Sequence, residues 1–234
     1  VKKKRQIRNL QIQKPQSMKL ILNRIIFFLT FFCFTTIHAK DFQTSYNVST
    51  SGVKIGTFDW SLKVKDNKYI TEIHLKNSGI FSPLYRFEGE YFSNGLVVDN
   101  QFIAKEYKQS WKTKKQSKVV EISFDNGVTN LFQDPEEDEM ARINVESLFQ
   151  YYDPITSFIN ILSGFDEAKT IDGRRVYVMK KEPSNNLGKI NLKIKNYINI
   201  WADHKRNDLE KIEFYLNDNG FLPEKIKIFF KKRV

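Results

Sequence analysis

Apolar and polar residues alternate along several short segments of this sequence. Between Phe58 and Lys65, every second side chain is apolar and the residues between them are polar or charged. Side chains two positions apart on a β-strand lie on the same face, so this segment is predicted to be a strand with one buried face. The pattern recurs at 69–75, 120–124, 190–194, 212–216 and 226–230. The chain is therefore predicted to be mainly β.

Turn signals separate these segments. They lie at 66–67, 93–95, 125–127, 172–173 and 218–220, and all contain Asp, Asn or Gly. Short strands joined by tight turns predict an antiparallel meander of about ten to twelve strands. A sheet of that size shields its edges by curling, so we expect the meander to close into a barrel or half-barrel.

Alternation alone does not decide which face of such a sheet points inward. An outer-membrane barrel also alternates, with its apolar side chains toward lipid. The chain, however, ends in FFKKRV, with three charged residues, and contains the acidic loop QDPEEDEMAR. We therefore predict a soluble periplasmic domain and keep the outer-membrane barrel as the alternative.

One segment follows a helical period instead. Asp153 is suited to cap a helix, Pro154 to its first turn and Gly164 to its end. A single apolar stripe lies between them, formed by Ile155, Phe158, Ile159 and Leu162. We predict a short helix over 154–163 that covers the open end of the sheet. It would serve either as a plug in a solid core or as a lid over an apolar cavity.

An apolar run near the N-terminus has the form of a targeting signal. Ile25–Ile37 holds thirteen residues, which as a helix span about 20 Å against a hydrocarbon core of about 30 Å. Lys19 and Arg24 precede the run and the small residue Ala39 follows it. These features predict a signal peptide cleaved near Ala39. An uncleaved anchor is the alternative.

The expected domain organisation follows from this signal. Met18 is the expected start, so residues 1–39 form an upstream extension plus signal peptide, and 40–234 form a single β-rich periplasmic domain. The only cysteine, Cys33, would leave with the signal. Its large neighbours exclude a lipid-attachment signal, and the mature domain can form no disulfide.

The signal also changes the charge balance. Residues 1–39 hold eight of the 38 basic side chains and none of the 27 acidic ones, which leaves 30 basic against 27 acidic residues. Such a weak net charge does not favour nucleic acid as a partner. The remaining basic cluster, Lys108–Lys118, contains Trp111, and we expect it to be a solvated hairpin tip.

Signals for catalysis are weak. His74 and His204 are the histidines of the mature chain, and neither has metal ligands at a recognisable spacing. The acidic run Glu136–Glu139 lacks the alternating ligands and central glycine of a calcium loop. Nucleophile-elbow, phosphate-loop and dinucleotide motifs do not occur. We predict no enzyme, no catalytic residue, no metal site and no cofactor.

Two adjacent arginines are the polar residues of greatest interest. Arg174 and Arg175 follow the turn residues Asp172 and Gly173, and alternation places one of the two on the inner side of the sheet. The inner arginine would either pair with Asp166 or Asp172 at the rim, or bind a carboxylate or phosphate headgroup at a cavity mouth.

Several motifs together resemble a known family. They are SYNVSTSGVKIGTFDWSL, FDN at 124–126, DPITSFINIL, FDEAKTIDGRRVYVM and IWAD. In this order they resemble the bacterial exported proteins that carry domain of unknown function 3108, over most of residues 42–230. The resemblance implies a Gram-negative envelope protein with a β-rich fold. It implies no activity.

Two functions remain open. The first is a non-enzymatic binding module for an apolar or lipid-like ligand, with candidate ligand-binding residues Phe158, Ile159, Leu162, Arg174 and Arg175. The second is an envelope assembly protein with a solid core and a protein partner. The volume inside the sheet distinguishes them, because barrels of this strand number can be filled or hollow. Membrane contact is expected only through the signal peptide.

Export with cleavage after Ala39 is directly testable. We expect N-terminal sequencing of the protein from the cell envelope to begin at Lys40. An envelope form that retains residues 18–39 would instead show an anchored protein.

Overall fold

The computed structural model describes residues 39–78, 86–186, 188–202, 208–217 and 220–231. The predicted signal peptide up to His38, the upstream extension and His204 lie outside these residues. Within them, no helix is both long enough and apolar enough to cross a membrane. The first strand begins at Lys40, directly after the predicted cleavage site.

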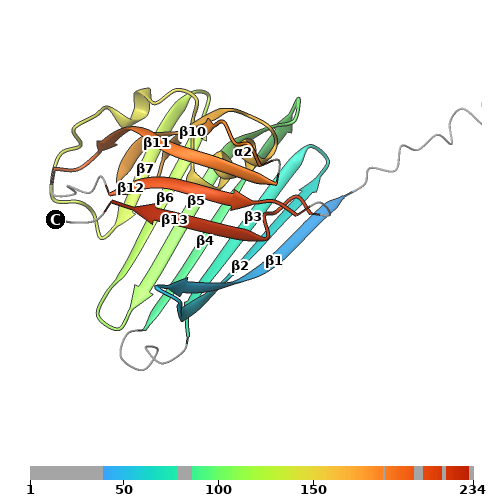
Figure 1. The fold of residues 1–234 in the computed structure, drawn as a ribbon. Helices are drawn as coiled ribbons and strands as arrows, with labels where there is room; N and C mark the ends of the chain where they lie inside the picture. Colours follow the sequence, from blue (N-terminus) through green and yellow to red (C-terminus); the bar gives the residue numbers. More distant parts are fainter. Residues whose placement is uncertain (1–38, 79–85, 187, 203–207, 218–219, 232–234) are drawn as a thin grey trace, which may run out of the picture. The chain divides into compact units, whose positions relative to one another are not determined.

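Seven strands in chain order form the first sheet, and every neighbouring pair is antiparallel (Figure 1). This confirms the predicted antiparallel meander, but with seven strands in place of the expected ten to twelve. The strands are β1 (Lys40–Thr50), β2 (Val53–Lys65), β3 (Lys68–Asn77), β4 (Phe87–Val98), β5 (Gln101–Thr113), β6 (Ser117–Asp125) and β7 (Val128–Asp134).

Two-residue turns join several of these strands. In the turns at 51–52, 66–67, 99–100 and 126–127, both residues have positive φ, as type I′ hairpin turns require. The turn predicted at 93–95 is wrong, because these residues lie inside β4. Gly95 sits at a register shift where an added Cβ would lie 2.0 Å from the carbonyl oxygen of Ile103. The glycine permits a bulge there, not a turn.

The second sheet has six strands in the order β13-β12-β11-β10-β9-β8. Its pairs are antiparallel except β8 with β9, which is parallel. The strands are β8 (Tyr151–Tyr152), β9 (Glu167–Ile171), β10 (Arg175–Glu182), β11 (Lys189–Asn199), β12 (Leu209–Tyr215) and β13 (Lys225–Phe230).

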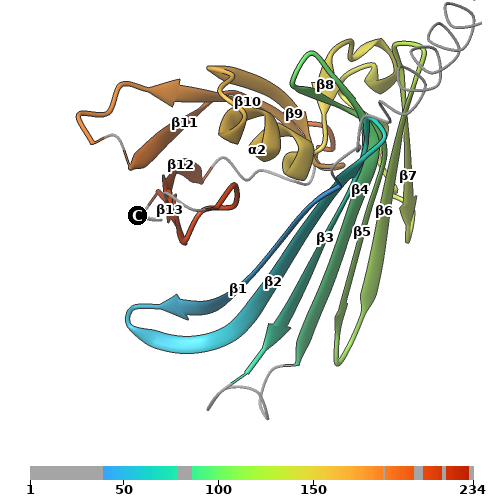
Figure 2. The same cartoon turned by 90° about the vertical axis from the view of Figure 1, so that its right-hand side faces the viewer.

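The expected closure into a barrel is wrong, because the strands form two open sheets. After β7 the chain leaves the first sheet through a loop that contains the short 3-10 helix η1 (Val145–Ser147), and it then starts the second sheet. Figure 2 shows the second sheet and the helix α2 (Pro154–Leu162) over one end of the curved first sheet. The first sheet therefore buries its concave face against a second layer and not by curling onto itself.

Helix α2 packs between the two sheets. Ile155 and Ile159 belong to the hydrophobic cluster that includes Trp60 and Leu62 of the first sheet, and both are at most 3% exposed. Ile161 lies in a second cluster, with Met179, Leu192 and Phe214 of the second sheet. The helix is therefore the common core element of both sheets.

Buried hydrogen bonds tie α2 to the first sheet. The Asp153 carboxylate caps the helix by accepting from the backbone N–H of Ile155 and Thr156, and it also accepts from the hydroxyls of Ser93 and Thr156. The Tyr69 hydroxyl lies 2.6 Å from the Thr156 hydroxyl. These contacts describe a plug with fixed polar anchors.

A second anchor lies on the last turns of the helix. The Asn160 amide makes two hydrogen bonds of 2.8 Å with the backbone of Phe102, one through its nitrogen and one through its oxygen. An opening of α2 would leave the backbone polar groups of Phe102 on β5 without these partners, which is costly in an apolar core.

The Asp153 carboxyl gives a pH-dependent prediction. Burial raises its pKa, although the hydrogen bonds from Thr156, Ser93 and Ile155 act in the opposite direction. A folded-state pKa above the unfolded value of about 3.9 means that the wild type loses stability as pH rises from about 4 through the folded pKa. We expect the wild type to lose stability relative to Asp153→Asn over this range in denaturant melts.

The Asn variant keeps a capping oxygen, and the hydroxyls of Ser93 and Thr156 can turn to accept from its amide nitrogen. Asp153→Ala removes every acceptor at this position and is expected to cost about 2 to 4 kcal/mol. Parallel stability curves for wild type and Asp153→Asn between pH 4 and 8 would contradict the buried, pH-sensitive carboxyl.

Candidate functional site

An apolar row crosses the concave face of the first sheet away from α2. Strand register places five residues side by side on this face: Tyr46, Phe58, Leu75, Gly89 and Trp111. We call them the aromatic floor. The four side chains are partly exposed, whereas Trp60 and Leu62, deeper on β2, are at most 1% exposed. The second sheet therefore covers only part of the concave face.

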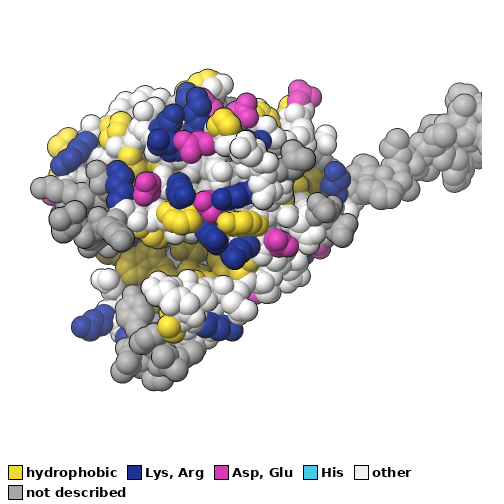
Figure 3. Space-filling model, viewed as in Figure 1, with side chains coloured by type: hydrophobic (Ala, Val, Ile, Leu, Met, Phe, Trp, Pro, Cys, Tyr) yellow, Lys and Arg dark blue, Asp and Glu magenta, His cyan; other side chains and the backbone are white. Residues whose placement is uncertain are grey.

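Strand β13 forms a roof opposite part of this floor. Its residues Ile226 and Ile228 pair with Phe214 and Ile212, so they lie on the inner face of the second sheet. Ile228 is nevertheless 53% exposed, while both partners are buried. Figure 3 shows hydrophobic side chains in a hollow between β13 and the β1–β2 hairpin. The edge of the second sheet thus overhangs an apolar hollow.

The turn before β13 joins the two sheets beside this hollow. The Tyr46 hydroxyl donates to the carbonyl oxygen of Pro223 at 2.5 Å, and the rings of Phe42 and Phe221 lie 5.3 Å apart. Burial raises the pKa of Tyr46 to about 12, so its hydroxyl stays protonated and able to donate. This contact fixes one side of the hollow.

Gly89 lies in the middle of the aromatic floor. A Cβ added there would lie 3.2 Å from the Tyr91 ring and 3.3 Å from the Phe87 ring, which flank the glycine on β4. The two rings therefore lean over the position and make the floor continuous. Because neighbouring strands are about 4.8 Å apart, the floor extends about 19 Å from β1 to β5.

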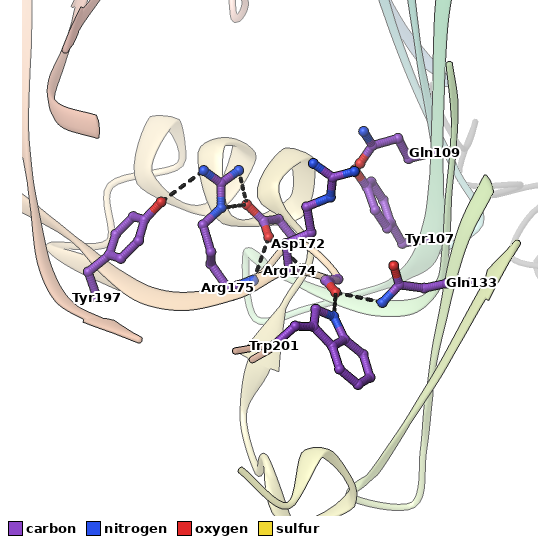
Figure 4. A network of polar contacts seen from close by, with 9 residues as sticks. Tyr107, Gln109, Gln133, Asp172, Arg174, Arg175, Tyr197 and Trp201 are labelled. Carbon is purple, nitrogen blue, oxygen red and sulfur yellow. Dashed lines mark hydrogen bonds and ion pairs between the residues drawn. The ribbon is translucent and has the colours of Figure 1, made fainter. Parts of the chain in front are cut away.

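The Asp172-Gly173-Arg174 turn, between β9 and β10, adjoins β6 and β7 of the first sheet (Figure 4). The Asp172 carboxylate accepts from the backbone N–H of Arg174 and Arg175. The Gly173 carbonyl accepts from the side chains of Gln133 on β7 and Trp201 at 2.9 and 3.0 Å. The turn is therefore held by both sheets.

Arg175 has a structural role in this turn. Its guanidinium forms an ion pair with Asp172 at 2.7 Å and donates to the Tyr197 hydroxyl at 2.8 Å. This is the rim pairing with Asp172 that the sequence offered as one alternative. The pair occupies the second oxygen of Asp172, while the backbone bonds occupy the first.

The Arg174 side chain extends in the opposite direction to that of Arg175. The Arg174 guanidinium carbon lies 5.9 Å from the centre of the Trp111 ring, at the end of the aromatic floor, and the side chain extends toward Tyr107 and Gln109 (Figure 4). Among the described residues, it forms no ion pair. Nearby, the Gln133 side chain is 5% exposed and its oxygen has no hydrogen-bond partner in the described part of the chain.

Comparison with known proteins identifies the family. The model described as "Protein of unknown function (DUF3108)" matches residues 45–232. The chain belongs to the DUF3108 family. This confirms the family that the sequence motifs resemble, and the matched region of this DUF3108 protein includes α2, the Asp-Gly-Arg turn and most of both sheets. No curated protein and no solved structure matched the chain.

The helix residues proposed from the sequence lie apart from the aromatic floor. Ile159 is fully buried, and the Phe158 ring packs edge-on against Phe214 at 5.4 Å. Leu162 borders an open groove of about 710 Å³, whose lining combines charged residues of β9 and β10 with the apolar side chains of Ile190 and Leu216. The structure therefore unites Arg174 with the floor, but it does not add Phe158, Ile159 or Leu162 to it.

The predicted hairpin tip at 108–118 is confirmed only in part. The residues between β5 and β6 are exposed. Lys118, however, is 7% exposed and forms an ion pair with Glu137 of the acidic loop. Trp111 and Lys118 are register partners on the concave face, so this end of the cluster belongs to the wall of the site and not to the exposed tip.

No candidate metal site is found in the described part of this DUF3108 protein. No three residues among its His, Cys, Asp and Glu side chains are grouped to hold an ion there. The Nδ1 atom of His74 lies 3.9 Å from Oε1 of Glu90, and both side chains are exposed on the face opposite the aromatic floor.

The substitution Gly173→Ala tests whether the Asp172-Gly173-Arg174 turn depends on close contact with the first sheet. Gly173 has φ of +82°, and an added Cβ would lie 2.4 Å from Cγ1 of Val120 on β6. We expect Gly173→Ala to cost about 3 kcal/mol in denaturant unfolding, from backbone strain plus overpacking.

Val120→Ala provides the matched control. Alone, it should cost about 2 kcal/mol through lost packing. In the double variant the clash is absent, so the combined cost should be smaller than the sum of the single costs. Strictly additive costs would show that the turn does not press against β6.

Proposed function

We propose that this DUF3108 protein is an exported, non-enzymatic envelope protein that binds an apolar or lipid-like ligand on the aromatic floor. The observation that carries the proposal is the apolar row, which stays partly exposed because the second sheet covers it only in part. Large contiguous apolar surfaces are rare on proteins that bind nothing.

Hydrophobic burial would supply the binding free energy. Each 100 Å² of apolar surface removed from water contributes about 2.5 kcal/mol before the entropy cost of binding. An extended acyl chain could lie across β1 to β5, between the floor and the inner side of β13. Aromatic rings at Phe58, Tyr91 and Trp111 would supply broad, rigid contact surfaces.

Export is supported by the arrangement at the N-terminus. A basic flank, a short apolar run and Ala39 precede the first strand, and β1 begins at Lys40. Cleavage after Ala39 would therefore leave every described strand intact. The proposed location is the periplasm, where a protein that shields apolar chains from water would have lipid-like molecules to bind.

An envelope assembly protein is the second candidate, and the solid core under α2 favours it. Ile159, Thr156 and Ser157 are fully buried, so the space beneath the helix is filled by side chains. In this case β13, the edge strand of the second sheet, would present Ile228 and Phe230 to a partner chain. Edge strands with exposed apolar residues are suited to strand addition.

Paired substitutions on β3 test the ligand proposal. Leu75 lies on the aromatic floor and His74 on the opposite face of the same strand. We expect Leu75→Asn to weaken binding of a fluorescent long-chain fatty alcohol about tenfold, because losing one such apolar contact costs about 1 to 2 kcal/mol. His74→Asn should bind like the wild type.

Thermal unfolding of both variants, done first, establishes that they are folded at the assay temperature. Equal affinities of Leu75→Asn and wild type would place the ligand elsewhere. If neither the fatty alcohol nor the matching fatty acid binds the wild-type mature domain at micromolar concentration, the assembly protein becomes the favoured candidate.

A further inference from the structure

We propose that Arg174 binds an anionic headgroup, a carboxylate or phosphate, and that the ligand is therefore an anionic amphiphile whose tail lies on the aromatic floor. The inference rests on the proposed function and adds the chemical class of the ligand. It is carried by the position of one cation and by the groups around it.

Among the described residues, Arg174 has no counterion, although it is only partly exposed. The nearest acid in the sequence, Asp172, is already saturated by two backbone N–H groups and by the Arg175 guanidinium. The ring and amide that Arg174 approaches, Tyr107 and Gln109, are uncharged at neutral pH. A half-buried guanidinium in this setting gains most from an anion supplied by a ligand.

The arginine is also held in place before any ligand arrives. Gln133 and Trp201 fix the preceding carbonyl, Asp172 fixes the Arg174 N–H, and the Trp111 ring lies against the guanidinium. A cation–π position over an indole leaves the N–H groups of an arginine free for a bidentate bond to a carboxylate or phosphate. Little ordering of the protein would be needed to bind such a group.

An unpaired acceptor lies on the same wall. The Gln133 amide nitrogen donates to Gly173, which fixes the orientation of the amide and leaves its oxygen without a partner among the described residues, in a side chain 5% exposed. Buried polar atoms in proteins rarely stay unpaired. A water that the headgroup holds would donate a hydrogen bond to this oxygen.

Trp111 connects this headgroup position to the tail position. It contacts Arg174 on one side and is the β5 member of the aromatic floor on the other. A ligand with its charge at Arg174 could therefore extend its apolar chain from β5 toward β1 without leaving the floor. The site therefore has a cationic end at Arg174 and an apolar row beside it, which matches the anionic headgroup and apolar tail of an amphiphile.

Two fluorescent probes with the same apolar chain, a fatty acid and the corresponding fatty alcohol, distinguish binding of the charged headgroup from binding of the chain. We expect Arg174→Met to weaken binding of the acid about tenfold or more, and of the alcohol less than about twofold. Arg174→Lys should lose less of the acid affinity, because it keeps the charge without the bidentate geometry. Raising the salt concentration should weaken acid binding to the wild type more than to Arg174→Met.

Lys112→Met is the matched control. Lys112 is exposed, lies next to Trp111 on β5 and faces the opposite side of the sheet, so this change removes one positive charge without touching the site. Its affinities for both probes should equal those of the wild type. Equal loss of acid affinity in Lys112→Met and Arg174→Met would reduce the effect to net charge and overturn the inference.

The remaining outcomes separate this inference from the proposed function. If the wild type binds both probes and Arg174→Met changes neither affinity, or weakens both equally, Arg174 does not recognise the headgroup, and the apolar site remains. If the wild type binds neither probe, the proposed function fails and the headgroup site fails with it.

Discussion

The buried carboxylate of Asp153 is the constraint on which the layered architecture depends. It caps α2 and also accepts from Ser93 on β4, so one side chain ends the helix and attaches it to the first sheet. Without that attachment the apolar faces of α2 would have no fixed partner, because a nine-residue helix is not stable alone. The hydrogen-bonded Tyr69 and Thr156 extend the same anchor to β3. The position of the second sheet, which packs on the other side of α2, follows from this contact.

The extent of the second sheet then determines the site. Helix α2 and the second sheet bury the rows of the first sheet that contain Leu62 and Trp60, and the second sheet covers the row of Phe58 and Leu75 only in part. This partly covered row is chemically similar to the buried ones, since its strands continue the same alternation. Its partial exposure results from the size of the covering layer, and no difference in its own residues marks it.

This explains how far the sequence could predict the molecule. Alternation on β2 and β3 predicted the strands and their buried faces, because a period of two is a local property. Closure could not be predicted, because the choice between curling and a second layer depends on contacts such as Asn160 with Phe102, far apart in the chain. The turn predicted at 93–95 was wrong for a related reason. A glycine is needed at position 95 because β5 passes too close for a Cβ, and it does not mark a turn. The sequence placed one of Arg174 and Arg175 inward, and only the geometry of Asp172 showed which.

The Asp-Gly-Arg turn shows how one short segment can serve stability and recognition at separate positions. Gly173 admits the close contact with Val120, and Arg175 closes the rim by pairing with Asp172. Because that pairing and the backbone bonds occupy both oxygens of Asp172, the adjacent Arg174 has no acidic partner in the part of the chain that the structure describes. Alternation turns it to the opposite face, where Trp111 is the available surface. The unpaired cation is thus a consequence of the same hydrogen bonds that join the two sheets, so changes to the Arg174 side chain can alter recognition while leaving those bonds in place.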